Sequence, residues 1–374
     1  MNRAERGGLH TGLVIDADRL DTVISAELAR RRSEVVAVES GLAVEVDLLV
    51  GFVSDGGKRL RPEFLWCGWL AGGGSATGPD AEAVLQVGGA LELLQACALV
   101  HDDIIDRSER RRGRPSTHRA VAKQHADAGL AGDPEHHGVS VAVLLGDLAL
   151  AWADDLFLAG ALAIGAAGRT APVWRAMRTE VLAGQLLDLA VTASAVDDPA
   201  VQQRDAMLVN RYKTAAYTVE RPLQLGATLA GAGVATVDAL RAYGADVGVA
   251  FQLRDDLLGV FGDPAVTGKP AGDDLVEGKR TVLLALARAE LAGDPPRLAE
   301  LDAGIGRPDV DSRRLSELIA GTGAVEAVED RIAGLVGSGL AALDGVDPLG
   351  RPVLPDTVRR RLIDLATAAT VRSR

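Results

Sequence analysis

The sequence predicts a single all-α domain, and three observations lead to this prediction. No segment alternates apolar and polar residues over four or more positions, which is the pattern of a half-buried strand. Aromatic residues make up only 3% of the chain, and Ala, Leu, Val and Gly dominate its apolar part, which favours close helix packing. The 374 residues, 48% of them hydrophobic, show no repeat period and no interdomain linker. We therefore expect one helical bundle over residues 16–374.

Helical periodicity and capping residues place the elements. Residues 1–15 lack periodicity and are expected to be flexible. Asp16 or Asp18 would cap the first helix, because a short polar side chain accepts hydrogen bonds from free N–H groups at a helix start. Pro222 should kink or break its helix. The expected helices cover residues 16–50, 62–71, 81–107, 139–168 (one helix or a pair), 170–195, 199–231 and 234–259. A polar loop is expected over 262–278, followed by a helix that Lys279 opens and by further helices with joints near 291–312 and 344–355. Residues 111–138 are expected to be polar and partly helical.

Charge and cysteine content exclude several classes of function. The net charge of −12 argues against a general nucleic-acid-binding protein. Cys67 and Cys97 lie in apolar settings without CxxC spacing, so neither a disulfide framework nor a zinc site is indicated. The N-terminus lacks the apolar core of a signal peptide, and the longest apolar run, residues 156–167, is too short to span a bilayer. We expect a cytoplasmic protein without a membrane span or nucleic-acid partner.

An acidic cluster ends the apolar segment 81–100. Residues 100–106 read Val-His-Asp-Asp-Ile-Ile-Asp and are followed by an arginine-rich run. Asp102 and Asp106 would lie one turn apart on one helix face, where two carboxylates repel each other unless a cation lies between them. Oxygen ligands without His or Cys favour magnesium over zinc, and guanidinium groups bind phosphate oxygens in pairs. The cluster predicts a magnesium–phosphate site; a solvated acidic helix end beside a basic loop is the alternative.

Two further stretches carry the same chemistry. In the segment Gly-Gly-Lys-Arg-Leu-Arg-Pro over 56–62, Lys58 and Arg61 would flank a helix start, which favours anions. Residues 251–256, Phe-Gln-Leu-Arg-Asp-Asp, end a second apolar helix with another carboxylate pair. In a helical bundle two such ends can face each other across a cavity and hold magnesium ions around one diphosphate. Because a second acidic site is present, the sequence favours the magnesium–phosphate site over a solvated acidic helix end at residues 100–106.

Six motifs in chain order resemble those of the trans-isoprenyl diphosphate synthases, or polyprenyl synthetases. They are GGKRLRP, LVHDDIIDRSERRRG, GQLLDL, YKT, FQLRDD and TGKPAGDDLVEGKRT. The resemblance covers about residues 15–374, and the pattern is most similar to bacterial geranylgeranyl diphosphate synthases. It implies an isoprenoid-synthase-type helical bundle with a deep central cavity, usually a homodimer, in which about three magnesium ions serve the condensation of isopentenyl diphosphate with an allylic prenyl diphosphate.

The resemblance also implies a role for each matching residue. Asp102 and Asp106 would bridge magnesium to the allylic diphosphate with Asp103 in support, and Asp255 would bind a third ion with Asp256 assisting through water. The allylic diphosphate would be gripped by Arg111, Lys213, Lys269 and Lys279. Isopentenyl diphosphate would be bound by Lys58, Arg61 and Arg112, with Gln95 at a position where the family carries His or Gln. The groups expected near the developing carbocation are Thr214, Gln252 and the carbonyl of Lys213.

The implied chemistry follows from charge. Magnesium and the cationic side chains would stabilise the departing pyrophosphate, and the allylic cation would form in a cavity that excludes water. The double bond of isopentenyl diphosphate would then attack that cation, and the resemblance suggests that the released pyrophosphate removes the final proton. One departure from the pattern is Gly259, which stands where many relatives carry a third Asp in the second acidic motif. Asp273 and Asp274 are candidates to compensate for it.

Small residues beneath the first acidic motif predict a long product. Ala98 lies one turn before Asp102, and Cys97 is beside it. In relatives that make fifteen-carbon products, bulky aromatic residues here close the cavity floor. We therefore expect products of at least twenty carbons, with geranylgeranyl diphosphate the first expectation and a longer polyprenyl diphosphate the alternative. Leu148, Trp152 or Phe157 are other residues that could set the floor.

Two other functions fit part of the sequence. A class I terpene cyclase also uses acidic helix ends, magnesium and a prenyl diphosphate, but it needs no second-substrate site of the kind that Lys58, Arg61 and Arg112 suggest. A non-catalytic partner subunit of a heteromeric synthase would be expected to lose aspartates, and this chain keeps both sets. A prenyltransferase is the function that uses all the motifs.

Overall fold

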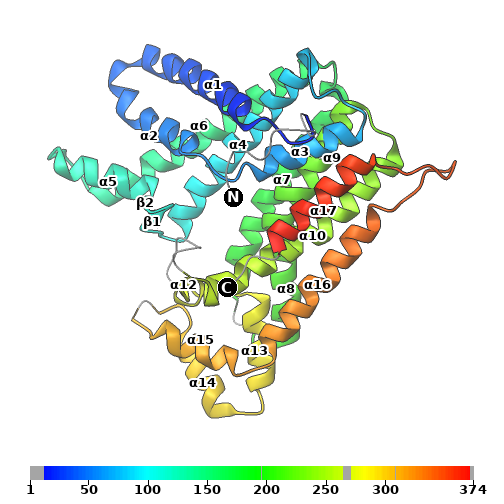
Figure 1. Cartoon of the computed structure of the whole chain (residues 1–374). Coiled ribbons are helices and arrows are strands. Elements are labelled where there is room, and N and C mark those ends of the chain that lie inside the picture. Colours follow the sequence, from blue (N-terminus) through cyan, green and yellow to red (C-terminus); the bar gives the residue numbers. More distant parts are fainter. Residues whose placement is uncertain (1–11, 195, 264–270, 308, 371–374) are drawn as a thin grey trace. The chain divides into compact units, whose positions relative to one another are not determined.

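The computed structural model describes residues 12–194, 196–263, 271–307 and 309–370, and its regular structure is almost entirely helical (Figure 1). This confirms the all-α prediction. Contacts between residues divide the chain into two compact units: unit 1 comprises residues 1–170 and 226–231, and unit 2 comprises residues 171–225 and 232–374. We describe each unit by itself, and the single domain over residues 16–374 stays a prediction.

Unit 1 is organised around α4 (Pro79–Ile105). Its buried residues lie on all sides of the helix, as expected where other helices surround it. Helices α1, α2, α3, α5 and α6 all pack against it, α6 along the greatest length. The elements of unit 1 besides α4 are α1 (Ala17–Val38), the 3-10 turn η2 (Ser40–Leu42), α2 (Ala43–Ser54), α3 (Leu60–Ala71), β1 (Arg110–Arg111), β2 (Arg114–Pro115), α5 (Thr117–Asp127) and α6 (Pro134–Ala163).

Helix α4 is also, among the described residues, the one helix that is long and apolar enough to cross a membrane. However, 78% of its most apolar window is buried inside the protein. A core helix meets the same length and composition test, so α4 is explained by its packing within unit 1. The cytoplasmic location expected from the sequence stays a prediction.

The N-terminal part differs from the prediction in two ways. The helix expected over 16–50 is split, because the chain turns to an extended conformation at Glu39 and Gly41 weakens helix formation. Asp16 is the N-cap, accepting a hydrogen bond from the N–H of Arg19 at 3.1 Å. The flexible segment expected over 1–15 lies outside the described residues up to position 11. Beyond it Ile15 is buried, and the Trp66 indole donates to the Gly12 carbonyl at 3.0 Å.

A small antiparallel ribbon in unit 1 was not predicted. Strands β1 and β2 pair with Arg110 opposite Pro115. Arg112 and Gly113 connect them with positive φ angles of 52° and 78°, as a tight type I′ hairpin turn requires. Two residues per strand are too few to produce a visible alternation, so the sequence indicated only a polar, partly helical segment.

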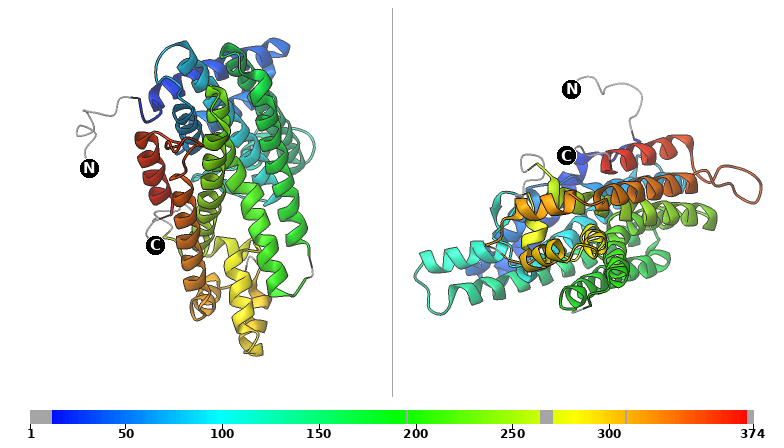
Figure 2. Two further views of the ribbon diagram at one scale, coloured as in Figure 1. Left: turned by 90° about the vertical axis from the view of Figure 1, so that its right-hand side faces the viewer. Right: turned by 90° about the horizontal axis from the view of Figure 1, so that it is seen from below.

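Unit 2 is built around α10 (Val234–Phe261), which packs against η3, α16, α17 and α13. Helix α16 lies beside α10 in each view (Figures 1 and 2). The other elements that lie wholly or partly in unit 2 are α7 (Ala167–Thr192), α8 (Pro199–Val209), the π-helix η3 (Asn210–Glu220), α9 (Arg221–Ala230), α12 (Asp273–Val276), α13 (Val282–Leu291), α14 (Pro295–Gly304), α15 (Ser312–Ala320), α16 (Ala324–Ala342) and α17 (Asp356–Thr370).

The helix expected over 199–231 is interrupted by the π-helix η3. Pro222 follows it directly as the second residue of α9, and proline cannot donate the hydrogen bond that a regular α-turn needs there. Glycines let neighbouring helices approach η3 closely. A Cβ at Gly184 of α7 would lie 2.3 Å from the Lys213 nitrogen, and one at Gly244 of α10 would lie 2.5 Å from the Glu220 Cα. Lys213 is thereby set close against the backbone of α7.

The segment expected as a loop over 262–278 contains the short helix α12, and its residues 264–270 lie outside the described part of the chain. The prediction that Lys279 opens the next helix is wrong. Helix α13 begins at Val282, because Gly278 has a left-handed φ of 76° and the Thr281 side chain caps the helix by accepting from the Leu284 N–H at 3.2 Å. Lys279 is therefore in the connection between α12 and α13.

Candidate active site

The first acidic motif lies at the C-terminal end of α4. The Asp106 N–H donates to the Asp102 carbonyl at 2.8 Å, so the two residues are one turn apart, as predicted. The helix stops there because Arg107 has a left-handed φ of 53°. Asp102 and Asp106 are half-buried and Asp103 is fully buried. Since the C-terminus of a helix carries partial negative charge, two carboxylates there favour a bound cation.

Asp103 turns into unit 1 and holds an arginine of β1. The Arg111 Nε and Nη2 donate to Asp103 Oδ1 at 2.8 and 2.5 Å, and Arg111 Nη2 lies 3.6 Å from Asp102 Oδ2. Burial raises the pKa of Asp103, although the contacts with Arg111 oppose this. Asp103 thus fixes a guanidinium group beside Asp102, and it acts on the site through Arg111.

The donor set at this helix end fits magnesium. Mg²⁺ is usually held by one or two carboxylates, while water and substrate phosphates complete its coordination. Within the described ranges no three His, Cys, Asp or Glu side chains converge on a point that could hold a metal. An ion held by Asp102 and Asp106 would therefore take most of its ligands from water and phosphate, and a guanidinium group such as that of Arg111, beside Asp102, can donate to phosphate oxygens.

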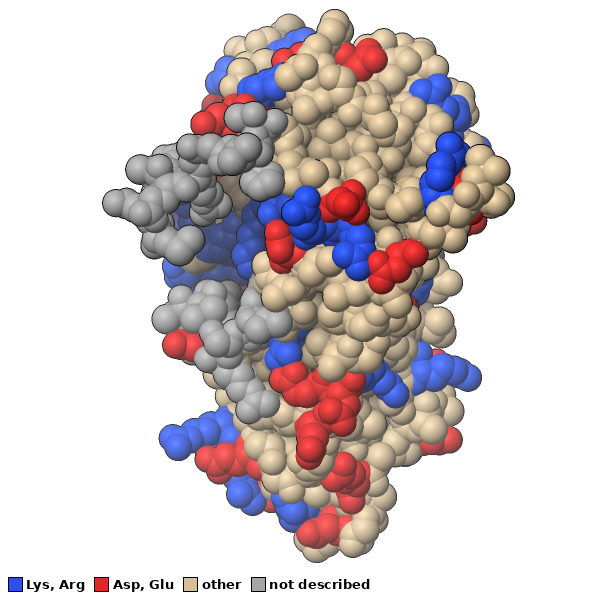
Figure 3. Space-filling view, turned by 45° about the vertical axis from the view of Figure 1, so that its right-hand side comes forward, with Lys and Arg blue, Asp and Glu red and all other residues tan. Residues whose placement is uncertain are grey.

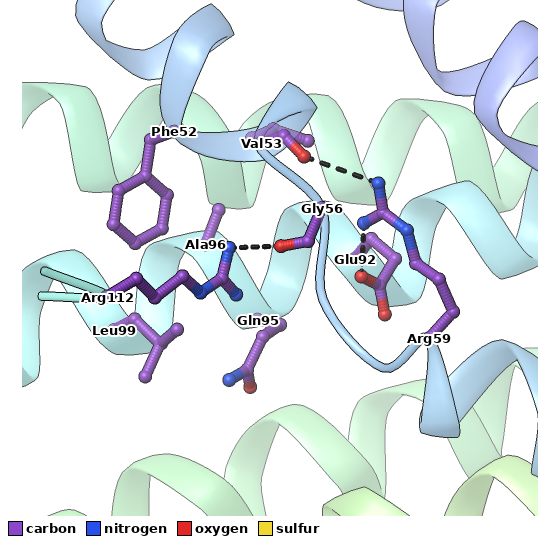
Figure 4. Close-up of a pocket in the computed structure, with 9 residues that line it drawn as sticks. All are labelled: Phe52, Val53, Gly56, Arg59, Glu92, Gln95, Ala96, Leu99 and Arg112. Atoms are coloured by element: carbon purple, nitrogen blue, oxygen red, sulfur yellow. Dashed lines mark hydrogen bonds and ion pairs between the residues drawn. The ribbon is translucent and has the colours of Figure 1, made fainter. Parts of the chain in front are cut away.

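A pocket in unit 1 gathers two of the residues predicted to bind the second substrate (Figure 4). Gln95 and Arg112 line it, together with Arg59, Glu92 and Phe52. Arg112 donates to the Gly56 carbonyl, and its guanidinium lies over the Phe52 ring at 5.6 Å. The Gln95 Oε1 is buried and has no hydrogen-bond partner within the described part of the chain. Lys58 and Arg61 are not among the lining residues.

Arg59 was not among the residues predicted to belong to the site. It anchors the turn that carries Lys58. Its guanidinium donates to the Glu92 carboxylate at 2.5 Å and to Asp21 at 3.0 Å (Figure 4 shows the contact with Glu92). Arg59 and Glu92 side chains are 10% and 8% exposed, so the pair is buried. The Arg59 backbone is left-handed, with a φ of 49°. A glutamate within the apolar run 81–100 was the signal in the sequence that could have revealed this partner.

Replacing Arg59 with Met is expected to lower the free energy of unfolding by about 3–5 kcal/mol, because the buried Glu92 would lose its partner. Chemical denaturation followed by circular dichroism measures this. The matched control is Arg114→Met, which removes an ion pair with Asp55 whose side chains are 71% and 37% exposed and should cost about 1 kcal/mol or less. Equal losses in the two variants would show that the Arg59 pair does not anchor the turn.

The residues predicted to control chain length differ in their surroundings. Cys97 is buried, its Sγ lies 3.8 Å from His101 Nδ1, and burial raises the pKa of its thiol to about 12. The thiol is therefore neutral and unsuited to act as a nucleophile. Ala98 is only half-buried. Of the alternative floor residues on α6, Trp152 and Phe157 are buried and Leu148 is half-buried.

The second acidic motif lies at the end of α10 in unit 2. Asp255 is half-buried, whereas Asp256 is 5% exposed. Asp256 accepts hydrogen bonds from the Gln252 side-chain amide at 2.7 Å and from that of Asn210 at 3.3 Å. Burial raises the pKa of Asp256 to about 7. Asn210, the first residue of η3, was missed by the sequence reasoning because it lies 46 positions from Asp256.

Asp256 should make the stability of the magnesium-free protein depend on pH. Its pKa is raised from 3.8 to about 7 in the folded state, so the folded protein keeps a proton that the unfolded chain releases. The stability that Asp256 contributes by keeping this proton is complete below pH 3.8 and is lost as pH rises through about 7. Asp256→Asn should therefore flatten the fall in unfolding free energy between pH 5 and pH 8, by roughly a few kcal/mol. Parallel curves for the two proteins, measured by denaturant titration, would contradict this.

Two of the predicted lysines in unit 2 are paired with acids. Lys213 Nζ lies 2.6 Å from Asp188, the aspartate of the GQLLDL motif. Lys279 Nζ lies 2.8 Å from Asp274 and 2.9 Å from Glu277. Burial would lower the pKa of Lys279, but the two carboxylates outweigh it and hold that pKa well above its usual value. Both lysines are held in fixed positions. Thr214 is half-buried in η3, and Lys269 lies outside the described residues.

Comparison with known proteins identifies the family. The family model described as "Polyprenyl synthetase" matches residues 47–320. The chain belongs to the polyprenyl synthetase family. The crystal structure of geranylgeranyl pyrophosphate synthase from Corynebacterium glutamicum, complexed with isoprenyl diphosphate and magnesium, is 46% identical, with a TM-score of 0.87 over 96% of this chain and 100% of that one. This polyprenyl synthetase therefore has the all-α fold that the sequence predicted.

Two curated relatives differ in the product that their names give. Geranylfarnesyl diphosphate synthase of Aeropyrum pernix is 34% identical over 236 residues, which is 63% of this chain and 67% of that protein. Geranylgeranyl diphosphate synthase of Mycobacterium tuberculosis is 33% identical over 258 residues, 68% of this chain and 66% of that protein. The chain thus matches about two thirds of their length, and its product length stays a prediction.

Proposed function

We propose that this polyprenyl synthetase is a magnesium-dependent prenyltransferase. It condenses isopentenyl diphosphate with an allylic diphosphate into a trans-polyprenyl diphosphate. The observation that carries the proposal is the end of α4, where Asp102 and Asp106 are one turn apart and Asp103 holds Arg111 beside them. The solved relative complexed with isoprenyl diphosphate and magnesium supports the same assignment.

The proposed metal ligands are Asp102 and Asp106 from unit 1 and Asp255 from unit 2, for about three ions. Magnesium, when bound, would neutralise the diphosphate and so make it a better leaving group. Within unit 1, Arg111 would bind the allylic diphosphate. Asp103 keeps that guanidinium in place through both of its donating nitrogens.

The remaining side chains have the roles that the family resemblance implies. Lys213, Lys269 and Lys279 would bind the allylic diphosphate, and the pairing of Lys213 with Asp188 fixes its ammonium group in advance. Lys58, Arg61, Gln95 and Arg112 would bind isopentenyl diphosphate. Because the Gln252 amide nitrogen donates to Asp256, its oxygen is the end left to face positive charge. That orientation suits the proposed place of Gln252 and Thr214 near the carbocation, since a carbonyl oxygen stabilises positive charge without donating a proton.

Geranylgeranyl diphosphate is the product that we propose. Ala98 and Cys97 are small, and Cys97 is packed inside unit 1, which leaves Ala98 as the side chain that can border the growing prenyl chain. A longer polyprenyl diphosphate is the alternative product, and it agrees with the name of one relative, geranylfarnesyl diphosphate synthase.

Replacing Ala98 with Phe is expected to shorten the main product from twenty to fifteen carbons, because the aromatic ring would close the space beneath the first acidic motif. Mass spectrometry of the products measures this. Ala98→Leu should give an intermediate shift if the larger variant folds poorly. The control is Ala126→Phe, on an exposed position of α5, which should leave product length unchanged. An unchanged product length in both Ala98 variants would show that residues other than Ala98 form the floor of the product cavity.

We also propose a homodimer. Exposed leucines recur along α6 at Leu144, Leu158 and Leu162, and three more lie on α7 at Leu182, Leu186 and Leu189. Large apolar side chains that are exposed along a helix indicate an interaction site. On the face drawn in Figure 3, acidic and basic side chains lie next to one another between larger areas of other residues. Sedimentation velocity tests this proposal, and a monomer at micromolar concentration would contradict it.

The experiment that tests the reaction uses purified protein, magnesium, isopentenyl diphosphate and one allylic starter at a time, with products sized by mass spectrometry. A twenty-carbon product supports both the reaction and the product length. Pyrophosphate release without elongation would favour a class I terpene cyclase. No turnover with any starter would favour a non-catalytic partner subunit.

A further inference from the structure

Glu220 is the last residue of η3, and its carboxylate is buried inside unit 2. The residue is 1% exposed, and a Cβ on Gly244 of α10 would lie 2.5 Å from its Cα. Two arginines contact the carboxylate: Arg211 Nη2 lies 2.5 Å from Oε2, and Arg241 Nε donates to Oε1 at 3.1 Å. A buried charge needs such partners, because its desolvation is otherwise costly. Glu220 thus joins the end of η3 to its start, through Arg211, and to α10, through Arg241.

The pair formed by Arg211 and Glu220 depends on the π-helical winding of η3. The two residues are nine positions apart in the chain. In an α-helix, with about 100° per residue, nine positions end about half a turn away, on the opposite face. A π-helix has i→i+5 hydrogen bonds and about 4.4 residues per turn, so nine positions complete about two turns and return to the same face. The ion pair therefore fits a π-helix and would be broken in an α-helix.

The same winding places Lys213 and Glu220 on different faces of η3. They are seven positions apart, which is about two turns of an α-helix, so in an α-helix both side chains would lie on one face. In a π-helix seven positions make about one and a half turns, which separates them. Lys213 Nζ contacts Asp188 of α7 at 2.6 Å, whereas Glu220 contacts Arg241 of α10. The π-helical winding lets these two pairs form with two different helices.

We propose that Glu220 is a positioning residue for prenyl transfer, because its pair with Arg211 keeps η3 in the π-helical form. In that form Lys213 and Thr214 are held where the allylic diphosphate would bind. The proposal rests on the proposed function, since it concerns how two residues of that site are placed. A π-helix as long as η3 needs support, because π-helical winding is rare and is usually confined to a single turn. The pair supplies this support from the first turn of η3 to its last residue.

The kinetic test compares two substitutions that each remove one guanidinium group from Glu220. Arg211→Met opens the pair within η3 and should raise the KM of the allylic diphosphate at least about 10-fold, the effect of one hydrogen bond to a charged group. The KM of isopentenyl diphosphate should stay at the wild-type value. The matched control is Arg241→Met, which leaves the pair within η3 and should change neither KM. Arg211→Lys keeps a cation at this position and should retain most of the wild-type affinity.

Hydrogen–deuterium exchange of the full chain tests the conformational part without any substrate. Amides of residues 210–220 should exchange at least about 10-fold faster in Arg211→Met and in Glu220→Gln than in the wild type. The double variant should exchange no faster than Glu220→Gln alone, because both substitutions break one interaction. Arg241→Met should leave these amides at the wild-type rate. Equal acceleration throughout unit 2, or none in residues 210–220, would overturn the proposal.

The outcomes separate this proposal from the proposed function. If wild-type protein elongates prenyl chains but Arg211→Met keeps the wild-type KM for the allylic diphosphate, Glu220 does not position the site and the function stands. If wild-type protein does not elongate prenyl chains, the proposed function fails, and the positioning role fails with it. The exchange measurement would then still decide whether the pair of Arg211 and Glu220 holds η3 in its π-helical form.

Discussion

Asp102→Asn is expected to lower the rate of prenyl elongation at least about 1000-fold at saturating magnesium, with little change in stability. A metal ion that stabilises a leaving group contributes several kcal/mol to catalysis, and each 1.36 kcal/mol corresponds to a factor of 10 in rate. Asp102 is half-buried at a helix end, so an amide of the same shape can replace it without leaving a buried charge. The loss should therefore appear in the rate rather than in the Tm. Initial rates and circular dichroism of the same preparation measure both.

The matched control for this variant is Asp127→Asn. Asp127 is the last residue of α5 and pairs with Lys123, and both side chains are more than 60% exposed, at 64% and 70%. It shares with Asp102 the negative end of a helix but lacks a second carboxylate one turn away. Elongation should proceed at the wild-type rate in this control. A rate for Asp102→Asn within tenfold of wild type would mean that Asp102 is not a ligand of the catalytic magnesium.

The parts of the site that the sequence predicted depend on local spacing. Asp102 and Asp106 are four positions apart in one helix, and helical geometry alone places them on the same face. The glycines of the GGKRLRP motif and the apolar run before Asp102 likewise indicate a turn and a buried helix without knowledge of the fold. The family resemblance, which rests on the order of such motifs, was confirmed for this reason.

The parts of the site that could not be predicted from the sequence depend on contacts between residues far apart in the chain. Arg59 and Glu92 are 33 positions apart, and Asn210 and Asp256 are 46 apart. Glu92 stands out in the sequence as a glutamate within the apolar run 81–100, but nothing local points to Arg59 as its partner or distinguishes Asn210 from an exposed polar side chain. The π-helix η3 was missed for another reason, because π-helices with i→i+5 hydrogen bonds are rare and occur inside segments that are otherwise α-helical. Its position follows from close packing at Gly184 and Gly244, which can be seen only once the helices are placed.

Arg111→Met is expected to have the second large effect, on both rate and stability. The substitution would remove the guanidinium proposed to bind the allylic diphosphate and would leave Asp103 buried without its partner. Breaking a buried ion pair on one side costs about 3–5 kcal/mol of stability. The pKa of Asp103, already raised by burial, should rise further, so the stability lost should be greater at pH 8 than at pH 5. Denaturant titration at the two pH values and steady-state kinetics with the allylic diphosphate varied measure these effects.

A second substitution separates the two roles of Arg111. The double variant Asp103→Asn/Arg111→Met lacks the unpaired charge at position 103. It should therefore recover much of the stability lost in Arg111→Met, and its stability should depend less on pH. Elongation should stay slow, because an asparagine at 103 cannot bind phosphate in place of the arginine. Recovery of the rate together with the stability would show that Arg111 serves only to neutralise Asp103. Failure to recover stability would show that the two side chains are not coupled, although Arg111 Nε and Nη2 both contact Asp103 Oδ1.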